Sequence, residues 1–361
     1  MTKAAELAKI GEVLTNSQIG GRRNLIINGA VSVNQRNVGT VNVNATNNGY
    51  TTADRWQANR TADDKYSIQV STDAPDNFNS SLLATSLSAY SVSASDIFFL
   101  QQSIEGNNCV NLAWGSSAAE TITLSFYVKS SLTGTFGGCL ANSAHNRSYP
   151  FSYSISSANT WERKTLTITG DTSGTWLTDN STGVQVIFGL GGGSTRSGTA
   201  GAWNSNTNYT ATGATSLVGT SGATWQITGV QFEIGKDTPF EHRSFGEELA
   251  LCQRYYYQSW GSGAWASNIG PGYAGQVLPA ANNASSQGTC SFPVAMRAAP
   301  TVTTYDGLGA SGTVTQPAIA NGIAATAGSI SVSGFFSVTK DSGTFTVGTP
   351  VIGQFKASIE L

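Results

Sequence analysis

Segments in which apolar and polar residues alternate with a period of two recur through the first two thirds of the chain. The clearest is "ETITLSFYVKS" at 120–130, where four apolar residues from Ile122 to Val128 share one face. This period fits a half-buried β-strand, whereas an amphipathic helix requires a period of 3.6 residues. The alternation returns in "WERKTLTITG", "GVQVIFGL" and "ATWQITGVQFEIG". In the last segment the phase slips at Gly229, which predicts a β-bulge.

About nine such strands are expected between residues 24 and 240, with no helical pattern between them. Besides the segments above, strands are predicted at 25–35, 53–58, 65–71, 96–103 and 149–156. A parallel sheet would need crossover helices, so the pattern predicts a mainly β chain with an antiparallel sandwich. Only 11% of the residues are charged, too few to cover the outer faces of many helices, which agrees with this fold class.

One charged segment, "FEHRSFGEELALCQRYYYQSW" at 240–260, follows helix rules instead. Ser244 and Glu247 are spaced as a capping box, in which each side chain bonds a free backbone N–H of the first turn. We therefore predict a short helix at 244–257, with Leu249, Cys252 and Tyr256 as its apolar stripe. Its charges are expected to satisfy helix ends and to pair across chains. Residues 3–14 are predicted to form a second short amphipathic helix.

These patterns divide the chain into four predicted parts. Residues 1–23 form a helical anchor and joint, 24–240 the β-sandwich, 241–258 a linking helix, and 259–361 a second, smaller β domain. In this last part, strands are predicted near 274–279, 288–294, 300–305, 328–339 and 350–361.

Composition excludes several classes of function. The net charge of −2 provides no basic surface for nucleic acid, and no apolar run is long enough to cross a bilayer or to act as a signal peptide. We therefore expect no nucleic-acid partner and no membrane insertion. The four cysteines are widely spaced, so we expect free, buried thiols and folding in a reducing compartment.

Residues with the spacing of a catalytic or metal site are scarce. His145 and His242 have no nucleophile motif nearby, and the 21 acidic residues are scattered rather than paired for sugar cleavage. Asp54, Asp171 and Asp179 lack the density of a calcium loop. We therefore expect no enzyme activity, no metal and no cofactor.

Aromatic residues in polar loops are the best candidates for a binding site. Flat aromatic faces can pack against the C–H faces of sugar rings, while amides and hydroxyls donate hydrogen bonds. Two groups are predicted to bind carbohydrate: Trp260, Trp265 and Tyr273 in one, Trp203 and Tyr209 in the other. The alternative for both groups is core or edge packing. The remaining tryptophans are predicted to lie in the core: Trp56, Trp114, Trp161, Trp176 and Trp225.

Eight ordered segments between about residues 20 and 302 resemble tail-fibre and related virion structural proteins of bacteriophages. They are "NLIINGAVSVNQR", "TTADRW", "LQQSIEG", "TLSFYVKSS", "SANTWERKTLTITGDTSGTW", "ITGVQFEIG", "FEHRSFGEELALCQRYYY" and "FPVAMRAAPTV". The strand-rich middle also resembles the jelly-roll sandwiches of carbohydrate-binding modules.

The resemblance implies a virion component made in the cytoplasm of the host bacterium. It implies a homotrimeric tail fibre that is attached to tail or adaptor proteins by its N-terminal segment. Its C-terminal domain would then be the distal tip and its receptor a host surface polysaccharide. Two alternatives remain open, a capsid cement or head-decoration protein and a polysaccharide-degrading tailspike.

Overall fold

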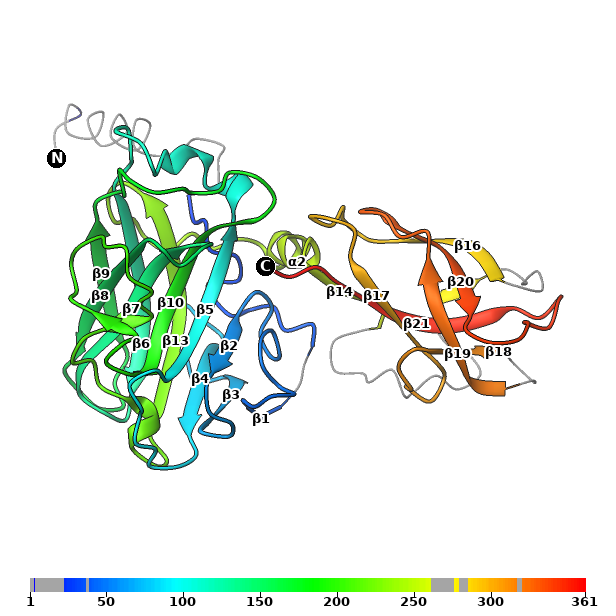
Figure 1. Ribbon diagram of the computed structural model, residues 1–361, viewed down its shortest axis with the longest axis horizontal. Coiled ribbons are helices and arrows are strands. Elements are labelled where there is room, and N and C mark those ends of the chain that lie inside the picture. The colour runs from blue at the N-terminus through cyan, green and yellow to red at the C-terminus, as the bar shows by residue number, and fades with distance from the viewer. Residues whose placement is uncertain (1–2, 4–22, 37–38, 261–275, 279–284, 317–319) are drawn as a thin grey trace. The chain divides into compact units, whose positions relative to one another are not determined.

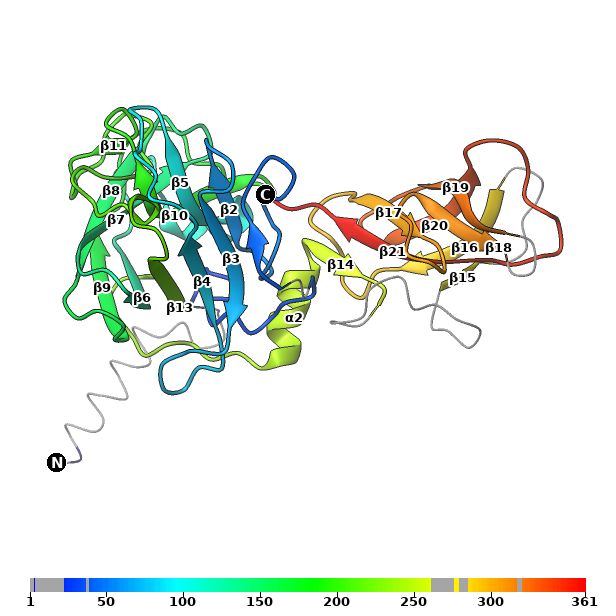
Figure 2. The same cartoon turned by 90° about the horizontal axis from the view of Figure 1, so that it is seen from below.

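A computed structural model describes residues 3, 23–36, 39–260, 276–278, 285–316 and 320–361. The helix predicted at 3–14 lies outside these residues, apart from Lys3. The described residues form two compact units (Figure 1, Figure 2). The first comprises those of Met1–Ser32, Gly39–Thr52 and Trp56–Arg243; the second comprises those of Val33–Val38, Ala53–Arg55 and Ser244–Leu361. Two short segments from the N-terminal part of the sequence thus belong to the second unit.

The first unit is an antiparallel β-sandwich, as predicted (Figure 1). Its six-stranded sheet has the order β1 (Val41–Asn42), β3 (Tyr66–Ser71), β4 (Ser81–Ser86), β13 (Thr224–Ile234), β6 (Ile122–Ser130), β9 (Glu162–Ile168). Its five-stranded sheet has the order β2 (Gln57–Arg60), β5 (Ile97–Glu105), β10 (Thr182–Gly192), β7 (Gly134–Asn142), β8 (Ser148–Ile155). The chain passes repeatedly from one sheet to the other, as it does in a jelly roll.

Short elements lie in the connections of this unit. They are the 3₁₀ turns η1 (Gly106–Asn108), η2 (Val110–Leu112) and η3 (Leu217–Gly219), and the two-residue parallel pair β11 (Ser197–Gly198) and β12 (Thr210–Ala211).

Aromatic side chains of both sheets meet in the sandwich core. The ring of Phe188 on β10 lies 5.1 Å from Phe126 on β6 and 5.9 Å from Trp225 on β13, centroid to centroid. The four apolar residues predicted on one face of 120–130 are all fully buried, so the period-two pattern placed that strand correctly.

The predicted bulge is present in β13. Its register against β6 shifts between Thr228 and Gln231, and Gly229 has a φ of +60°. A Cβ atom at Gly229 would lie 2.7 Å from the ring of Phe78 and 2.9 Å from that of Tyr127. Glycine therefore satisfies both the backbone conformation and the close approach of these rings.

The strand predicted at 25–35 is wrong. Asn28 and Val31 have left-handed φ values of 59° and 54°, which interrupt an extended chain. Side chains hold this segment instead, since Asn24 Nδ2 donates to the carbonyl oxygen of Val230 and the indole of Trp56 donates to that of Asn28. The strand predicted at 53–58 begins only at residue 57.

The helix predicted at 244–257 is shorter than expected. Helix α2 spans Phe245–Gln253, and strand β14 (Tyr256–Gln258) follows it. Ser244 Oγ accepts a hydrogen bond of 3.3 Å from the backbone N–H of Glu247. The residues of α2 that are buried are Glu248, Leu251 and Cys252, so the expected stripe was only partly right.

The charges just before α2 bind the start of the sandwich in the same chain. The carboxylate of Glu241 accepts from the backbone N–H groups of Arg23 and Asn24, at 3.3 and 2.9 Å. Arg243 donates to the carbonyl oxygens of Asn24 and Ile26 and pairs with Glu241. These groups therefore satisfy backbone atoms of a segment that forms no strand.

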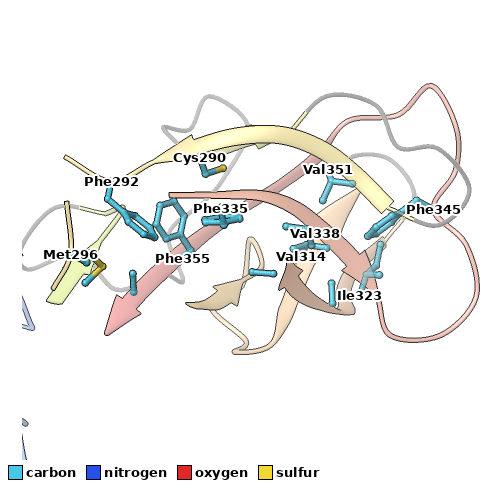
Figure 3. Packing of buried hydrophobic residues seen from close by; sticks show 13 residues of the cluster. Cys290, Phe292, Met296, Val314, Ile323, Phe335, Val338, Phe345, Val351 and Phe355 are labelled. Atoms are coloured by element: carbon cyan, nitrogen blue, oxygen red, sulfur yellow. The ribbon is translucent and has the colours of Figure 1, made fainter. Parts of the chain in front are cut away.

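The second unit is built on an eight-stranded sheet. Six strands follow the order β14, β21 (Val351–Ser358), β18 (Thr313–Gln316), β19 (Ala320–Gly328), β20 (Gly334–Lys340), β16 (Ser285–Ser291), while β15 (Gln276–Leu278) and β17 (Thr301–Tyr305) also pair with β21. Figure 3 shows its core, in which Phe355 of β21 packs edge-on against Phe335 of β20 at 4.8 Å. A second, smaller β domain was predicted here, although β18 and β19 were missed.

A buried ion-pair network lies inside this unit. The carboxylate of Glu360 pairs with Arg36 at 2.8 Å and with Arg55, and Arg36 also pairs with Asp54 at 3.1 Å. Burial raises the pKa of Asp54 to about 6, while Arg36 opposes that shift. The guanidinium of Arg36 also lies 3.7 Å from the ring centre of Tyr256, in a cation–π contact. The network joins the two N-terminal segments of the unit to its C-terminal end.

All four cysteines are free and buried, as predicted. Among the described residues, no helix combines the length and the apolar character needed to cross a bilayer.

Candidate functional site: an aromatic cluster and a polar hub

Four aromatic side chains gather in the first unit, and we call them the edge cluster: Trp114, Tyr149, Trp176 and Trp203. The ring of Trp203 lies 5.2 Å from Trp114, 5.4 Å from Trp176 and 5.2 Å from Tyr149, centroid to centroid. Trp114 and Trp176 are 4.8 Å apart and nearly perpendicular. Edge-to-face contacts of this kind are favourable for aromatic quadrupoles.

The edge cluster lies beside strands β8 and β9, which end their sheets. Trp203 Nε1 donates to the carbonyl oxygen of Thr169, directly after β9, at 2.8 Å. The next residue, Asn204, exchanges backbone hydrogen bonds with Ser148 of β8, at 2.9 and 3.0 Å. The loop that carries Trp203 therefore connects the margins of both sheets and satisfies backbone groups at the edge.

One ring of the edge cluster is buried and the other three are partly exposed. Trp114 is 8% exposed, and its indole N–H donates to the carbonyl oxygen of Glu120 at 2.9 Å. Trp176 and Trp203 are partly exposed, as is Tyr149. The indole N–H of Trp176 donates to the carbonyl oxygen of Ser173 at 3.1 Å. Since every indole N–H in the cluster has a backbone partner, the tryptophans offer a ligand only ring atoms.

A network of amides and hydroxyls adjoins the edge cluster, and we call it the polar hub: Asn142, Asn146, Ser148, Asn204 and Asn208. Asn208 Nδ2 donates to Ser148 Oγ at 3.0 Å and to Asn204 Oδ1 at 2.9 Å. Asn142 Nδ2 donates to Asn146 Oδ1 at 2.7 Å. Asn142 Nδ2 also donates to the carbonyl oxygen of Thr175 at 3.0 Å, so the hub joins three loops through neutral groups.

One ion pair joins the hub to the loop of Trp176. Arg147 Nε and Nη2 donate to the two oxygens of Asp171, at 2.7 and 2.6 Å, which is a bidentate pair. Asp171 also accepts from the backbone N–H of Ser173 at 3.1 Å. The stem of Arg147 passes over Gly174, where a Cβ atom would lie 2.4 Å from Arg147 Cγ.

Tyr209 makes a separate set of aromatic contacts. Its ring stacks on Phe99 at 5.1 Å and on His145 at 5.0 Å, and it packs against the outer face of the five-stranded sheet. Burial lowers the pKa of His145, so its imidazole is neutral at pH 7. Trp203 and Tyr209, predicted as one group, therefore contact different aromatic partners.

The other predicted group is described only in part. Trp260, in the second unit, is partly exposed and packs edge-on against Tyr305 at 5.2 Å. Lys356 Nζ lies 5.6 Å from the ring centre of the same tyrosine. Trp265 and Tyr273 lie outside the described residues.

Of the residues in this site, only Trp203 was predicted to bind carbohydrate. Trp176 was assigned to the core with Trp114 and Trp161, yet Trp176 and Trp161 are both partly exposed. Trp56, Trp114 and Trp225 are buried, as predicted. Trp176 follows "DTSGT", a polar loop of the kind that singled out Trp260, so this signal was available. Tyr149 and Arg147 had no such signal, because only the fold brings them beside Trp203.

The acidic residues considered for calcium have other partners. Asp171 is paired with Arg147, and Asp54 with Arg36. Within the described ranges, no group of three or more His, Cys, Asp or Glu side chains is arranged to hold a metal ion.

No protein-family model matches this chain, and no curated protein matches it significantly. Among solved structures it is similar to the enzymatically active domain of bacteriophage CBA120 tailspike protein 4, at 13% identity and a TM-score of 0.32, over 59% of this chain and 21% of that one. It is also similar to MgGH51 α-L-arabinofuranosidase (13%, TM-score 0.34, 66% and 30%) and to a family 11 carbohydrate-binding module from Clostridium thermocellum (11%, TM-score 0.28, 57% and 99%).

This chain spans about a fifth to a third of the length of the first two structures. All three TM-scores are below 0.5, so these similarities carry no argument about what the chain binds or does.

Proposed function

We propose that this chain is a non-catalytic adhesion protein whose first unit binds glycans at the edge cluster. The observation that supports this most directly is the group of three partly exposed rings, Tyr149, Trp176 and Trp203, beside the accessible amides of Asn146 and Asn204. Aromatic rings offer apolar faces to sugar C–H groups, and amides offer hydrogen bonds to sugar hydroxyls.

The cluster is suited to this role because it is held before a ligand arrives. Backbone carbonyls anchor Trp176 and Trp203, and the buried ring of Trp114 supports both. Side chains fixed in this way lose little conformational freedom on binding, which favours affinity. A small site of this type binds weakly by itself.

At the level of the particle, we infer a homotrimeric tail fibre in the virion, with host surface polysaccharide as its receptor. The ordered segments that resemble phage virion proteins support this assignment. Three copies of a weak site raise avidity by about 10²- to 10⁴-fold when they engage one surface. Light scattering of the full chain should give three times its 37.5 kDa mass, whereas a stable monomer would contradict the trimer.

Removal of residues 1–20 should abolish attachment of the chain to tail components. If the shortened chain is instead lost from capsids, the protein is a decoration protein.

The glycan site is tested by replacing Trp176 with alanine and measuring binding to a glycan array and to host polysaccharide. Truncation of a central aromatic contact should weaken binding at least about tenfold. Trp161→Ala is the matched control. Trp161 is also a partly exposed tryptophan and directly precedes β9, but its indole N–H donates to Asp73, which lies outside the edge cluster. Equal binding by the Trp176→Ala variant and the wild type would contradict the site.

The absence of catalysis is tested separately. Incubation of the full chain with a polysaccharide that it binds should release no new reducing ends. Sustained release would show that the protein is a tailspike enzyme, and the proposal of simple adhesion would then be wrong.

A further inference from the structure

The loops around the edge cluster contain very few ionisable side chains. In sequence, the stretches 113–121, 142–148, 169–179 and 199–208 contribute one arginine, Arg147, one histidine, His145, and three carboxylates, Glu120, Asp171 and Asp179. His145 is neutral at pH 7 for the reason given above. Glu120 and Asp179 are exposed, so at neutral pH Arg147 is the single cation of these loops and Asp171 is its counter-ion.

Arg147 and Asp171 neutralise each other in a bidentate contact, which we call a closed ion pair. Two of the three guanidinium nitrogens of Arg147 bond Asp171, and the third, Nη1, has a long contact of 3.4 Å with Ser205 Oγ. The side chain of Arg147 is 16% exposed and that of Asp171 is 2% exposed. A carboxylate arriving at the rings would meet a cation that already has a buried counter-ion.

We propose that this site selects neutral glycans over acidic ones, and that Asp171 determines this selectivity by holding Arg147 in a closed ion pair. The inference rests on the proposed function and adds the class of glycan. A sugar hydroxyl can exchange hydrogen bonds with Asn146 and Asn204, the asparagines of the hub that are not buried. A sugar carboxylate would lose hydration without gaining a free cation. Selectivity then comes from an element that disfavours the wrong ligand.

The wild-type chain is tested first with alginate and polygalacturonate, each compared with its carboxyl-reduced form. Each pair keeps the same backbone and differs in the carboxylate. We expect the reduced form to bind at least about tenfold more tightly by titration calorimetry at low salt. Tighter binding of the acidic form would overturn the selectivity while leaving the glycan site intact. Binding of neither form, together with no binding on the array, would overturn the proposed function itself.

The role of Asp171 is tested with Asp171→Asn, which keeps the shape of the side chain and frees the charge of Arg147. Binding of the acidic forms should improve at least about fivefold at about 20 mM salt and return toward the wild-type value at about 0.5 M salt. The double variant Arg147→Met, Asp171→Asn should lose this gain. An unchanged preference in a folded Asp171→Asn protein, checked by circular dichroism, would show that Asp171 does not set the selectivity. If that variant does not fold, the wild-type comparison still decides whether the site prefers neutral glycans.

Discussion

Individual charged residues in this chain mostly satisfy partners within the protein. Glu241 and Arg243 bond the backbone of residues 23–26, and Arg147 and Asp171 bond one another. Only 11% of the residues in this chain are charged, and groups such as Glu241 and Arg243 form hydrogen bonds with backbone atoms that have no partner in a helix or sheet. These hydrogen bonds to the backbone explain why Glu241 and Arg243 belong to the charged segment 241–254.

Gly229 is the one glycine of β13 and is buried, so its substitution should be poorly tolerated. Alanine at this position should lower the free energy of unfolding by about 1–3 kcal/mol, because a φ of +60° strains an L-residue and the new methyl meets Phe78. Urea unfolding measures the change.

Gly213→Ala separates the two causes. Gly213 also has a positive φ of 77°, but a Cβ there would have no atom within 4 Å. It should therefore show only the backbone part of the loss. If both variants are equally stable, the contact with Phe78 contributes nothing.

At the scale of elements, α2 depends on local signals at its start and on tertiary contacts at its end. Ser244 caps the first turn, as the sequence indicated. The end was mispredicted because Tyr256, which fits the helical stripe, instead pairs with Ser358 of β21. A pairing with a residue more than 100 positions away leaves no mark in the local pattern.

Ser244→Ala should destabilise the second unit by about 1 kcal/mol, since the N–H of Glu247 loses its acceptor in a helix of nine residues. Hydrogen exchange of peptides from 245–253 measures the local opening. Ser244→Asp should restore protection, because aspartate is also a good N-cap. Faster exchange in both variants would assign the effect to something other than the cap.

In the whole molecule, the two units are not two consecutive halves of the chain, because the second unit includes short segments from the N-terminal part. Arg36, Asp54 and Arg55 precede most of the sandwich in sequence, yet they belong to the second unit and pair with one another or with Glu360. The second unit therefore cannot be completed until the C-terminal residues are in place.

Glu360→Gln should destabilise the second unit by roughly 3 kcal/mol, because it removes the charge of a carboxylate that pairs with two buried guanidinium groups. The loss should appear as faster hydrogen exchange in β21 and a lower unfolding midpoint. Glu120→Gln, at an exposed position of the first unit, is the control and should change stability by less than about 0.5 kcal/mol. Equal stability of both variants would show that the network contributes no net stability.

The sequence by itself determined the fold class, most strands of the sandwich, the bulge at Gly229 and the start of α2, because each follows from residues a few positions apart. It failed at 25–35, where left-handed residues and long-range side-chain bonds replace a strand, and at β19, whose inward residues include small alanines. Tertiary structure alone decided how Tyr149 comes to lie beside Trp203, how Arg147 meets Asp171, and where the N-terminal segments belong. These features arise from contacts between residues far apart in the chain, and a local pattern of hydrophobicity contains no information about them.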